Sequence, residues 1–443
     1  MNDARLVCIR CGAAYPADRY AIQCTACGPD LPTALTVAYA NDRLKDVTRE
    51  RIARGPRSIW RYQHSLPVDA SHAISLGEGV TPMVSLTALG REMGLANLFG
   101  KCEFANPTGS FKDRLASVAI SSAARLFDAR VIASSSTGNA GAAVAAYAAR
   151  AGLDCIVFTA GVSSGPMISQ MLAFGATVVS VPSKADRWTL ISEGVDRFGW
   201  FPTSPFFGPP VGSNPFGIEG YKSLAYEICE DLDWKVPDWI VMPVCYGDAM
   251  YGVWKGFVEL QTLGWVDHVP RFAAAEIYGS LVEAFRTGSD TPPLMPQPYQ
   301  TAATSITSPQ GTFQSLTVLR KTRGVPVKTG EAEVADTRRR AARMEGVHLE
   351  TAAAASLAAA SALRANGTIG SDDTVVCLLT AGGLKEMLPA SDLGNSVLTV
   401  TADMDDVLKA VAATRGKDLT SKKHAAPARS DEPATRIVKG ATS

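Results

Sequence analysis

The sequence predicts an α/β protein with two parallel-sheet domains around a cleft, preceded by a small cysteine-rich ribbon. Three observations predict this fold. The chain has 443 residues, enough for about three domain-sized units. Short β-branched runs alternate with helical stretches of about ten to fifteen residues, which is typical of a parallel sheet covered by helices. Four of the nine cysteines lie within the first 27 residues.

The ribbon is expected over residues 1–40. Its cysteines form two CxxC pairs with twelve residues between them, Cys8 with Cys11 and Cys24 with Cys27. Each CxxC turn directs two thiolates to one point, and two such turns complete a tetrahedral, closed zinc site of the structural kind. The alternative is a ribbon that has kept its cysteines but holds no metal.

Residues 41–412 are expected to form the catalytic region, two interleaved α/β subdomains. Strand-like and helix-like segments alternate through it, and residues 291–311, rich in Pro and Thr, indicate a loop. The expected strands and helices lie at 97–127, 130–161, 165–174, 177–182, 238–244, 253–260, 271–279, 331–346, 351–365 and 374–386. Residues 413–443 contain few large apolar side chains, so they predict a disordered tail.

The charge balance excludes some classes of partner. Lys plus Arg total 43 and Asp plus Glu total 43, so the chain has no excess of basic residues to attract nucleic acid or an acidic membrane surface. The N-terminus has no apolar leader, and the apolar runs are too short to span a bilayer. These features predict a soluble, cytoplasmic protein with a small-molecule partner.

Lys112 lies in the segment NPTGSFKDR (106–114), at the expected first turn of a helix with Ser110 as its N-cap. The positive end of a helix disfavours a protonated amine, and an amine that loses its proton easily can act as a nucleophile or a proton shuttle. The alternative is a solvated surface lysine.

Three other segments are positioned to bind a ligand. SSSTGNAGAA (134–143) lies between a strand and an Ala-rich helix, where backbone N–H groups bind anions such as carboxylates. CYGDAMYG (245–252) follows a later strand and could hold a phosphate, provided that Asp248 faces away. Thr380 ends the apolar strand VVCLLT. The alternatives are ordinary strand-to-helix turns and a capping threonine.

These motifs resemble, in the same order, those of the threonine synthases and their relatives, the fold type II pyridoxal-phosphate enzymes. The segments concerned are LGEGVTP (76–82), NPTGSFKDR, the Ser-Thr-Gly-Asn loop, the loop before WKGF and LLTAGGLKE. A cysteine ribbon precedes the enzyme in one branch of this family. The resemblance covers about residues 1–390 and implies pyridoxal 5'-phosphate as the cofactor. We expect a homodimer.

The resemblance implies a role for each matching residue. Lys112 would form the Schiff base with the cofactor and move the Cα proton, and Phe111 would flank it. Asn139 would hydrogen-bond the cofactor 3-hydroxyl, whereas Ser136 and Thr137 would hold the substrate carboxylate. The cofactor phosphate would be bound by Cys245, Tyr246, Gly247, Asp248 and Ala249. Thr380 would meet the pyridine nitrogen, and a neutral hydroxyl there draws less charge into the ring than a carboxylate would, which favours elimination.

The sequence departs from the family in two places. Cys245 to Ala249 replace a common GNAGN segment, so phosphate binding would depend on backbone N–H groups. Gly217, in SNPFGIEGYKS (213–223), stands where an arginine helps hold the substrate phosphate in the family. Loss of that cation predicts poor use of phosphohomoserine unless Lys222, Lys184 or Arg187 replaces it.

The sequence therefore predicts a pyridoxal-phosphate lyase that converts O-phosphohomoserine to threonine and phosphate. One alternative is β-elimination of ammonia from serine, threonine or diaminopropionate. Another is a zinc-ribbon interaction protein built on an inactive scaffold, although the presence of Lys112, Asn139 and Thr380 argues against it.

Overall fold

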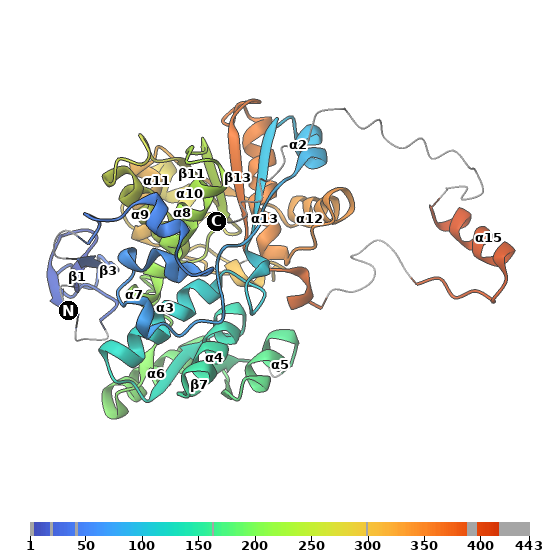
Figure 1. Cartoon of the computed structure of the whole chain (residues 1–443). Coiled ribbons are helices and arrows are strands. Elements are labelled where there is room, and N and C mark those ends of the chain that lie inside the picture. The colour runs from blue at the N-terminus through green and yellow to red at the C-terminus, as the bar shows by residue number, and fades with distance from the viewer. Residues whose placement is uncertain are drawn as a thin grey trace, which may run out of the picture. The chain divides into compact units, whose positions relative to one another are not determined.

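Two sheets of mainly parallel strands, together with the helices and loops that connect their strands, make up most of the described chain (Figure 1). The computed structural model describes residues 4–17, 21–39, 43–161, 164–297, 300–387 and 397–415. The chain divides into two units, Met1–Met387 and Leu388–Ser443. The first unit holds both sheets and the ribbon, so it ends before the boundary at 412 that the sequence predicts for the catalytic region.

The larger sheet has six strands in the order β12-β11-β10-β13-β5-β4. All neighbours are parallel except β4, which runs antiparallel to β5 at one edge. The strands are β4 (Met83–Ser85), β5 (Asn97–Cys102), β10 (Trp239–Pro243), β11 (Arg271–Glu276), β12 (Val325–Lys328) and β13 (Thr374–Leu379). The helices with this sheet are α2 (Thr87–Met93), α8 (Lys222–Asp231), α9 (Asp248–Thr262), α10 (Ser280–Thr287), α11 (Phe313–Lys321), α12 (Glu331–Glu345) and α13 (Thr351–Ala365).

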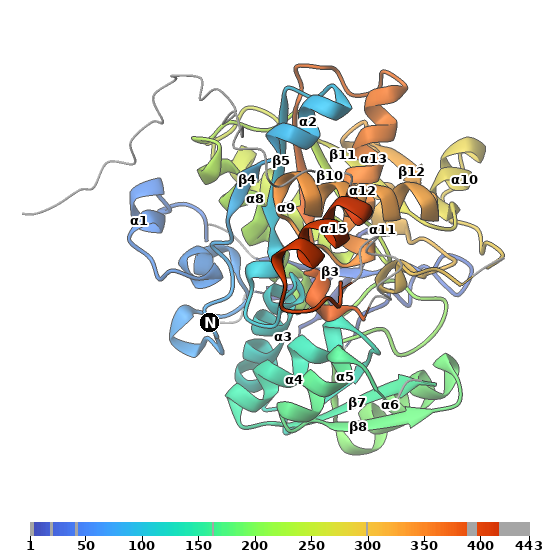
Figure 2. The same ribbon diagram turned by 90° about the vertical axis from the view of Figure 1, so that its right-hand side faces the viewer.

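The smaller sheet has four parallel strands in the order β8-β7-β6-β9 and is inserted in the chain between β5 and β10 (Figure 2). Its strands are β6 (Val131–Ser135), β7 (Asp154–Ala160), β8 (Thr177–Val181) and β9 (Phe201–Pro202). The helices of this part of the chain are α3 (Lys112–Leu126), α4 (Asn139–Ala151), α5 (Pro166–Ala173), α6 (Lys184–Phe198) and α7 (Pro215–Ile218).

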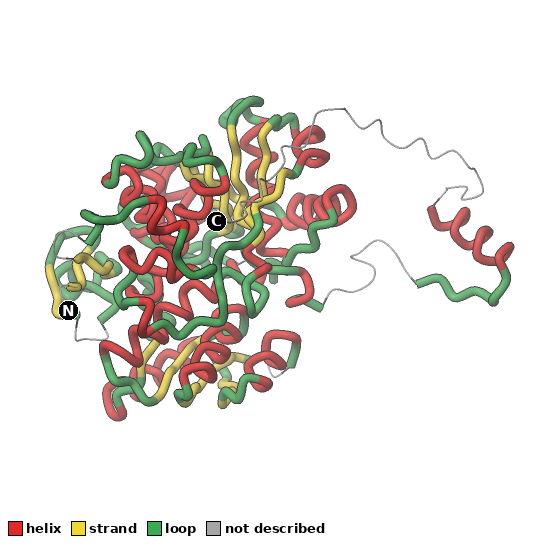
Figure 3. Tube along the Cα trace, viewed as in Figure 1, coloured by secondary structure: helices red, strands yellow, loops and turns green. Residues whose placement is uncertain are grey.

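Both faces of the larger sheet are buried, which explains the continuous apolar runs of its central strands. Along β10, Ile240 and Met242 pack with residues of α8, α9 and α11. Their neighbours Trp239 and Val241 pack on the opposite face with residues of α12 and α13. Figure 3 shows these strands enclosed by helices on either side. The structure confirms the predicted helix-covered parallel sheet.

The N-terminal ribbon is a separate antiparallel sheet in the order β2-β1-β3. Its strands are β1 (Ala4–Cys8), β2 (Ala14–Pro16) and β3 (Leu35–Tyr39). The remaining short elements are α1 (Arg49–Ala53) and the 3-10 turns Ile59–Ser65, Ala70–His72, Glu103–Ala105, Glu219–Tyr221, Thr304–Ile306 and Gly383–Lys385.

The described part of the second unit contains the helix α15 (Met404–Arg415). The predicted disordered tail, 413–443, therefore begins inside a helix. Asp405 and Asp406 lie in its first turn, where the helix dipole favours acidic side chains, and helix-forming residues such as Leu408 follow. Residues 416–443 lie outside the described part of the chain.

A buried ion network fixes the start of α3. The Arg114 guanidinium donates at 2.7 Å to Glu103 and at 2.7 Å to Glu227, and all three side chains are almost fully buried. Lys101 pairs with Glu227 at 3.1 Å. Because a buried charge is stable only when it is paired, these contacts hold Lys112, two residues before Arg114, in a defined place.

Across the described residues, no helix combines the length and the apolar composition that crossing a lipid bilayer requires.

Candidate active site

One cavity of about 280 Å³ lies where loops of both sheets meet. The loops follow the carboxyl ends of the parallel strands β6, β10 and β13, the edge at which open α/β sheets bind ligands. All the site residues that the sequence predicts outside the ribbon line this cavity, namely Phe111, Lys112, Ser136, Thr137, Asn139, Cys245, Tyr246, Gly247, Asp248, Ala249 and Thr380. The structure thus brings together residues that are up to 269 positions apart, because Phe111 and Thr380 are both among them.

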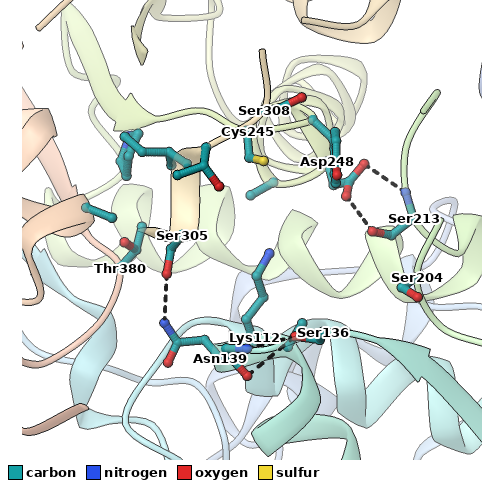
Figure 4. A pocket seen from close by; sticks show the side chains of 18 of the residues that line it. Lys112, Ser136, Asn139, Ser204, Ser213, Cys245, Asp248, Ser305, Ser308 and Thr380 are labelled. Carbon is teal, nitrogen blue, oxygen red and sulfur yellow. Dashed lines mark hydrogen bonds between the residues drawn. The ribbon is translucent and has the colours of Figure 1, made fainter. Parts of the chain in front are cut away.

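Lys112 is the first residue of α3, and its side chain points into the cavity (Figure 4). Its Nζ donates to the Tyr221 hydroxyl at 3.2 Å and lies 4.6 Å from the centre of the Phe111 ring. The N–H of Phe111 donates to the carbonyl of Thr380 at 2.9 Å. This hydrogen bond joins the start of α3 to the end of β13 and so positions the lysine.

Two predictions about Lys112 need correction. The N-cap of α3 is Phe111, and the Ser110 hydroxyl only approaches the Lys112 N–H, at 3.4 Å. Burial acts to lower the pKa of Lys112, but Tyr221, Asp248 and Cys245 together outweigh it, so the pKa is raised above its ordinary value. The raised pKa does not support an amine that loses its proton easily, because these neighbours favour the ammonium form more strongly than burial opposes it.

Asn139 begins α4 and is held by a carboxylate that the sequence does not single out. Its Nδ2 donates to Glu350 Oε2 at 2.6 Å and approaches the Ser305 hydroxyl at 3.5 Å. Ser305 in turn donates to the other oxygen of Glu350. The Asn139 Oδ1 is buried and has no hydrogen-bond partner among the described residues. Burial raises the pKa of Glu350.

The loop before α4 places the polar side chains of Ser136 and Thr137 at the cavity. The Ser136 hydroxyl accepts from the N–H groups of Gly138 and Gly141 at 3.2 and 3.0 Å, an arrangement that holds the first turn of the helix. Thr137 and Thr380 also line the cavity, and Thr380 is 5 % exposed. A small anion could meet the N-terminal amides of α4 here.

The start of α9 forms the opposite part of the cavity wall. Gly247 precedes the helix with φ of +80°, and a Cβ there would lie 2.0 Å from the Ser315 hydroxyl, so glycine is required. The first N–H groups of the helix have no intrahelical acceptor and can bind a phosphate. Both carboxylate oxygens of Asp248 are engaged, one by Gln314 at 2.6 Å and the other by the Ser213 hydroxyl at 2.7 Å (Figure 4).

Position 217 is not placed to supply a cation to the cavity. Gly217 is buried outside the cavity lining, and a Cβ there would lie 2.9 Å from Leu115 Cγ. Lys222 is also unsuitable, because it pairs with Glu219 at 2.6 Å and with Glu259 at 2.7 Å.

Lys184 and Arg187, the remaining two candidates, both line the cavity from the first turn of α6. Of the three cations that the sequence offers as replacements for the missing arginine, Lys184 and Arg187 therefore lie at the cavity, whereas Lys222 is already paired. Gly217 itself packs against Leu115 and Ala119 of α3.

The four ribbon cysteines form a second, separate cluster. Their Sγ atoms all lie within 4.8 Å of one another. Cys8 and Cys27 are 3.6 Å apart, and Cys11 and Cys24 are 3.7 Å apart. A tetrahedral site with zinc–sulfur bonds of about 2.3 Å separates its thiolates by about 3.8 Å, so the cluster has the dimensions of such a site.

The sequence-based reasoning missed Glu350, Ser305 and Tyr221. Glu350 precedes an Ala-rich helix, where an acidic residue is common for reasons of helix stability alone. Ser305 lies in a segment whose composition indicates only a loop, and Tyr221 resembles any aromatic core residue. Nothing in their local sequence distinguishes them from structural residues.

Comparisons with known proteins agree with this geometry. The family of pyridoxal-phosphate dependent enzymes matches residues 74–381. The threonine synthase of Methanocaldococcus jannaschii is 33% identical over 410 residues, which cover 91% of this chain and 98% of that protein. The threonine synthase of Mycobacterium tuberculosis is 31% identical over 338 residues, 75% of this chain and 89% of that protein.

Solved structures share the fold at lower identity. Maize serine racemase matches with a TM-score of 0.58 and 20% identity, over 69% of this chain and 89% of that one. A threonine deaminase from T.th. matches with a TM-score of 0.56 and 19% identity, over 70% of this chain and 94% of that one. The chain therefore belongs to the pyridoxal-phosphate-dependent enzymes, and within them it is a threonine synthase-like lyase of fold type II.

Proposed function

We propose that this enzyme converts O-phosphohomoserine to threonine and phosphate with pyridoxal phosphate held at Lys112. The observation that carries the proposal is the cavity itself, in which Lys112, the α4 loop, the start of α9 and Thr380 converge. The relatives that match most of the chain are named threonine synthases.

The residues present fit the cofactor. The cavity offers a lysine amine, a row of N–H groups at the start of α9 for a phosphate, and a buried Asn139 oxygen without a partner in the described part of the chain. We assign the loop from Cys245 to Ala249 to the cofactor phosphate, Thr380 to the ring nitrogen and Asn139 to the 3-hydroxyl. When bound, pyridoxal phosphate supplies an electron sink that stabilises negative charge on the substrate carbon that loses its proton.

The chain supplies binding and proton transfer. Ser136, Thr137 and the amides of α4 hold the substrate carboxylate, which fixes the Cα–H bond relative to Lys112. The Lys112 Nζ can take up the Cα proton and return it only in its neutral form, so it must first give up the proton that its neighbours favour. Tyr221, 3.2 Å away, accepts a hydrogen bond from that nitrogen. Removal of a Cβ proton would then let the Cγ–O bond break and phosphate leave. A proton would return to Cγ and to Cα, and water would supply the hydroxyl at Cβ, so that O-phosphohomoserine and water give threonine and phosphate.

We also propose that the ribbon cysteines bind one structural zinc. The four thiolates would fill all coordination positions and leave none for catalysis.

The test is to incubate the loaded enzyme with O-phosphohomoserine and to measure threonine and phosphate together. The same preparation is offered serine, threonine and diaminopropionate, and ammonia is measured. Equal amounts of threonine and phosphate, absent with the Lys112→Ala variant, would support the proposal. Ammonia release without threonine would instead support the β-eliminating alternative.

A further inference from the structure

Two cationic side chains on the α6 wall of the cavity have no acidic partner among the described residues. Arg187 is 8 % exposed, and its Nε is buried without a hydrogen bond to any described residue. Lys184, exposed at the rim, donates to the Tyr246 hydroxyl at 2.9 Å. Neither side chain forms an ion pair within the described part of the chain. Burial lowers the pKa of Arg187, with Tyr246 opposing this effect.

The carboxylates in the cavity wall are engaged elsewhere. Asp248 accepts hydrogen bonds from Gln314 and Ser213, and Glu350 accepts from Asn139 and Ser305. A buried guanidinium without a counter-ion is costly, so an anion brought by a ligand is the natural partner. Arginine suits a phosphate because its planar fork matches two oxygens, and lysine adds a point charge.

Two anions could reach this wall, the phosphate of the cofactor and a distal group of the substrate. The cofactor phosphate already has the free N–H groups of α9, which belongs to the larger sheet. Arg187 and Lys184 come from α6, which follows β8 of the smaller sheet. The same sheet carries the Ser136 loop assigned to the substrate carboxylate, so both substrate anions would lie along one wall. Lys184 joins this wall to the loop assigned to the cofactor phosphate through the Tyr246 hydroxyl.

We propose that Arg187 and Lys184 form the subsite for a distal phosphate on the amino-acid substrate. They would replace the arginine that the family carries at the position of Gly217. This inference rests on the proposed function for the orientation of the substrate. It adopts the alternative that Lys184 or Arg187 replaces the missing arginine, in which case phosphohomoserine would be well used.

The test is a binding measurement on the cofactor-loaded protein with two probes. One probe is 2-amino-5-phosphonopentanoate, and the other is 2-aminopentanoate, which has the same carbon chain without the phosphonate. Dissociation constants are measured by calorimetry for the natural protein and for Arg187→Gln, Arg187→Lys and Lys184→Gln. The matched control is Arg197→Gln, because Arg197 lies on the same helix with an exposed side chain paired to Glu193. The affinity for pyridoxal phosphate is measured separately.

We expect the natural protein to prefer the phosphonate. Arg187→Gln should weaken phosphonate binding by about 10- to 100-fold, the value of charge-assisted hydrogen bonds, and leave 2-aminopentanoate and cofactor affinities within about twofold. Arg187→Lys should retain part of the preference, and Arg197→Gln all of it. Lys184→Gln should have a smaller effect than Arg187→Gln, because Lys184 is exposed.

Two results would overturn the inference. If Arg187→Gln and Arg187→Lys keep the full phosphonate preference, no such subsite exists. If they lose cofactor affinity while the preference remains, the cations serve the cofactor phosphate. Failure of the proposed function looks different, because an enzyme that makes no threonine can still show an Arg187-dependent preference for the phosphonate.

Discussion

Asn139 shows how one carboxylate can decide what a neighbouring side chain offers to a ligand. Its amide nitrogen donates to Glu350, so its free, buried group is the oxygen, which can only accept a hydrogen bond. A hydroxyl of a bound ligand is a suitable donor for it. Glu350 therefore acts as a positioning residue, because it fixes which end of the Asn139 amide is free.

We expect Glu350→Ala to lower the affinity for pyridoxal phosphate by about tenfold or more, because a freed amide and an unpaired Ser305 cost about 1–3 kcal/mol. Glu350→Gln should fall between this variant and the natural protein, since it preserves the shape but not the acceptor pair. Absorbance titration of the cofactor measures both. Glu333→Gln, on the exposed face of α12, is the control. Unchanged affinity in Glu350→Ala would show that Asn139 does not depend on Glu350.

The N-terminal ribbon shows a different relation between sequence and structure. Three short strands supply little core of their own, whereas the two CxxC turns bring four sulfur atoms within 4.8 Å. Tyr15 supports this arrangement, because its hydroxyl lies 3.1 Å from the Cys24 Sγ and accepts from the N–H of Thr25 at 3.0 Å. An ion at the centre would connect both turns and so hold the ribbon together.

We therefore expect one zinc per chain by elemental analysis, and none in a Cys11→Ser, Cys24→Ser double variant. Removing zinc with a chelator should lower the unfolding temperature of the ribbon and leave the cofactor on Lys112. Cys155→Ser, which alters a buried cysteine of β7 far from the ribbon in sequence, should keep the metal. A natural protein purified with ample zinc and found to contain none would contradict the assignment.

The sequence predicts the elements of the site well, and the reason is local. Alternating apolar runs identify β6, β10 and β13, and a polar segment after each strand must lie at the same edge of a parallel sheet. Glu350, Arg187 and Gly217 show the limit of this reasoning. Whether a charge pairs with an acid, or a glycine faces a helix instead of a cavity, depends on contacts between distant segments. The homodimer and the cytoplasmic location stay predictions.

The first unit, taken together, is two sheets joined by long-range polar contacts. Lys385, just after β13, donates to the Thr108 carbonyl at 2.6 Å and to Gln170 of α5 at 2.6 Å. This contact connects the end of the larger sheet with a helix of the smaller one.

Burial of a titratable side chain makes the free energy of unfolding depend on pH, and His64 is such a side chain. We expect acid to destabilise the fold through His64. Burial, with Lys222 and Arg51 nearby, lowers its pKa from 6.5 to about 3. The unfolded chain therefore takes up a proton below about pH 6.5, whereas the folded chain does not until about pH 3. The His64 contribution is fully present above pH 6.5 and is lost as the pH falls toward 3, by up to about 1.4 kcal/mol per pH unit.

Denaturant unfolding from pH 7.5 to 4.5 measures this contribution as the difference between the natural protein and His64→Gln. The natural protein should lose stability relative to the variant as the pH falls below 6.5. His72→Gln, at an exposed position, is the control and should follow the natural protein. Parallel curves for the natural protein and His64→Gln would mean that His64 titrates alike in both states.

The most direct test asks which lysine holds the cofactor. The protein is loaded with pyridoxal phosphate, reduced with borohydride, digested and mapped by mass spectrometry. The cofactor should be attached to Lys112 in the peptide that contains NPTGSFKDR, and the Lys112→Ala variant should carry none. Attachment to Lys184, which also lines the cavity, or to any other lysine would contradict the assignment of the active site.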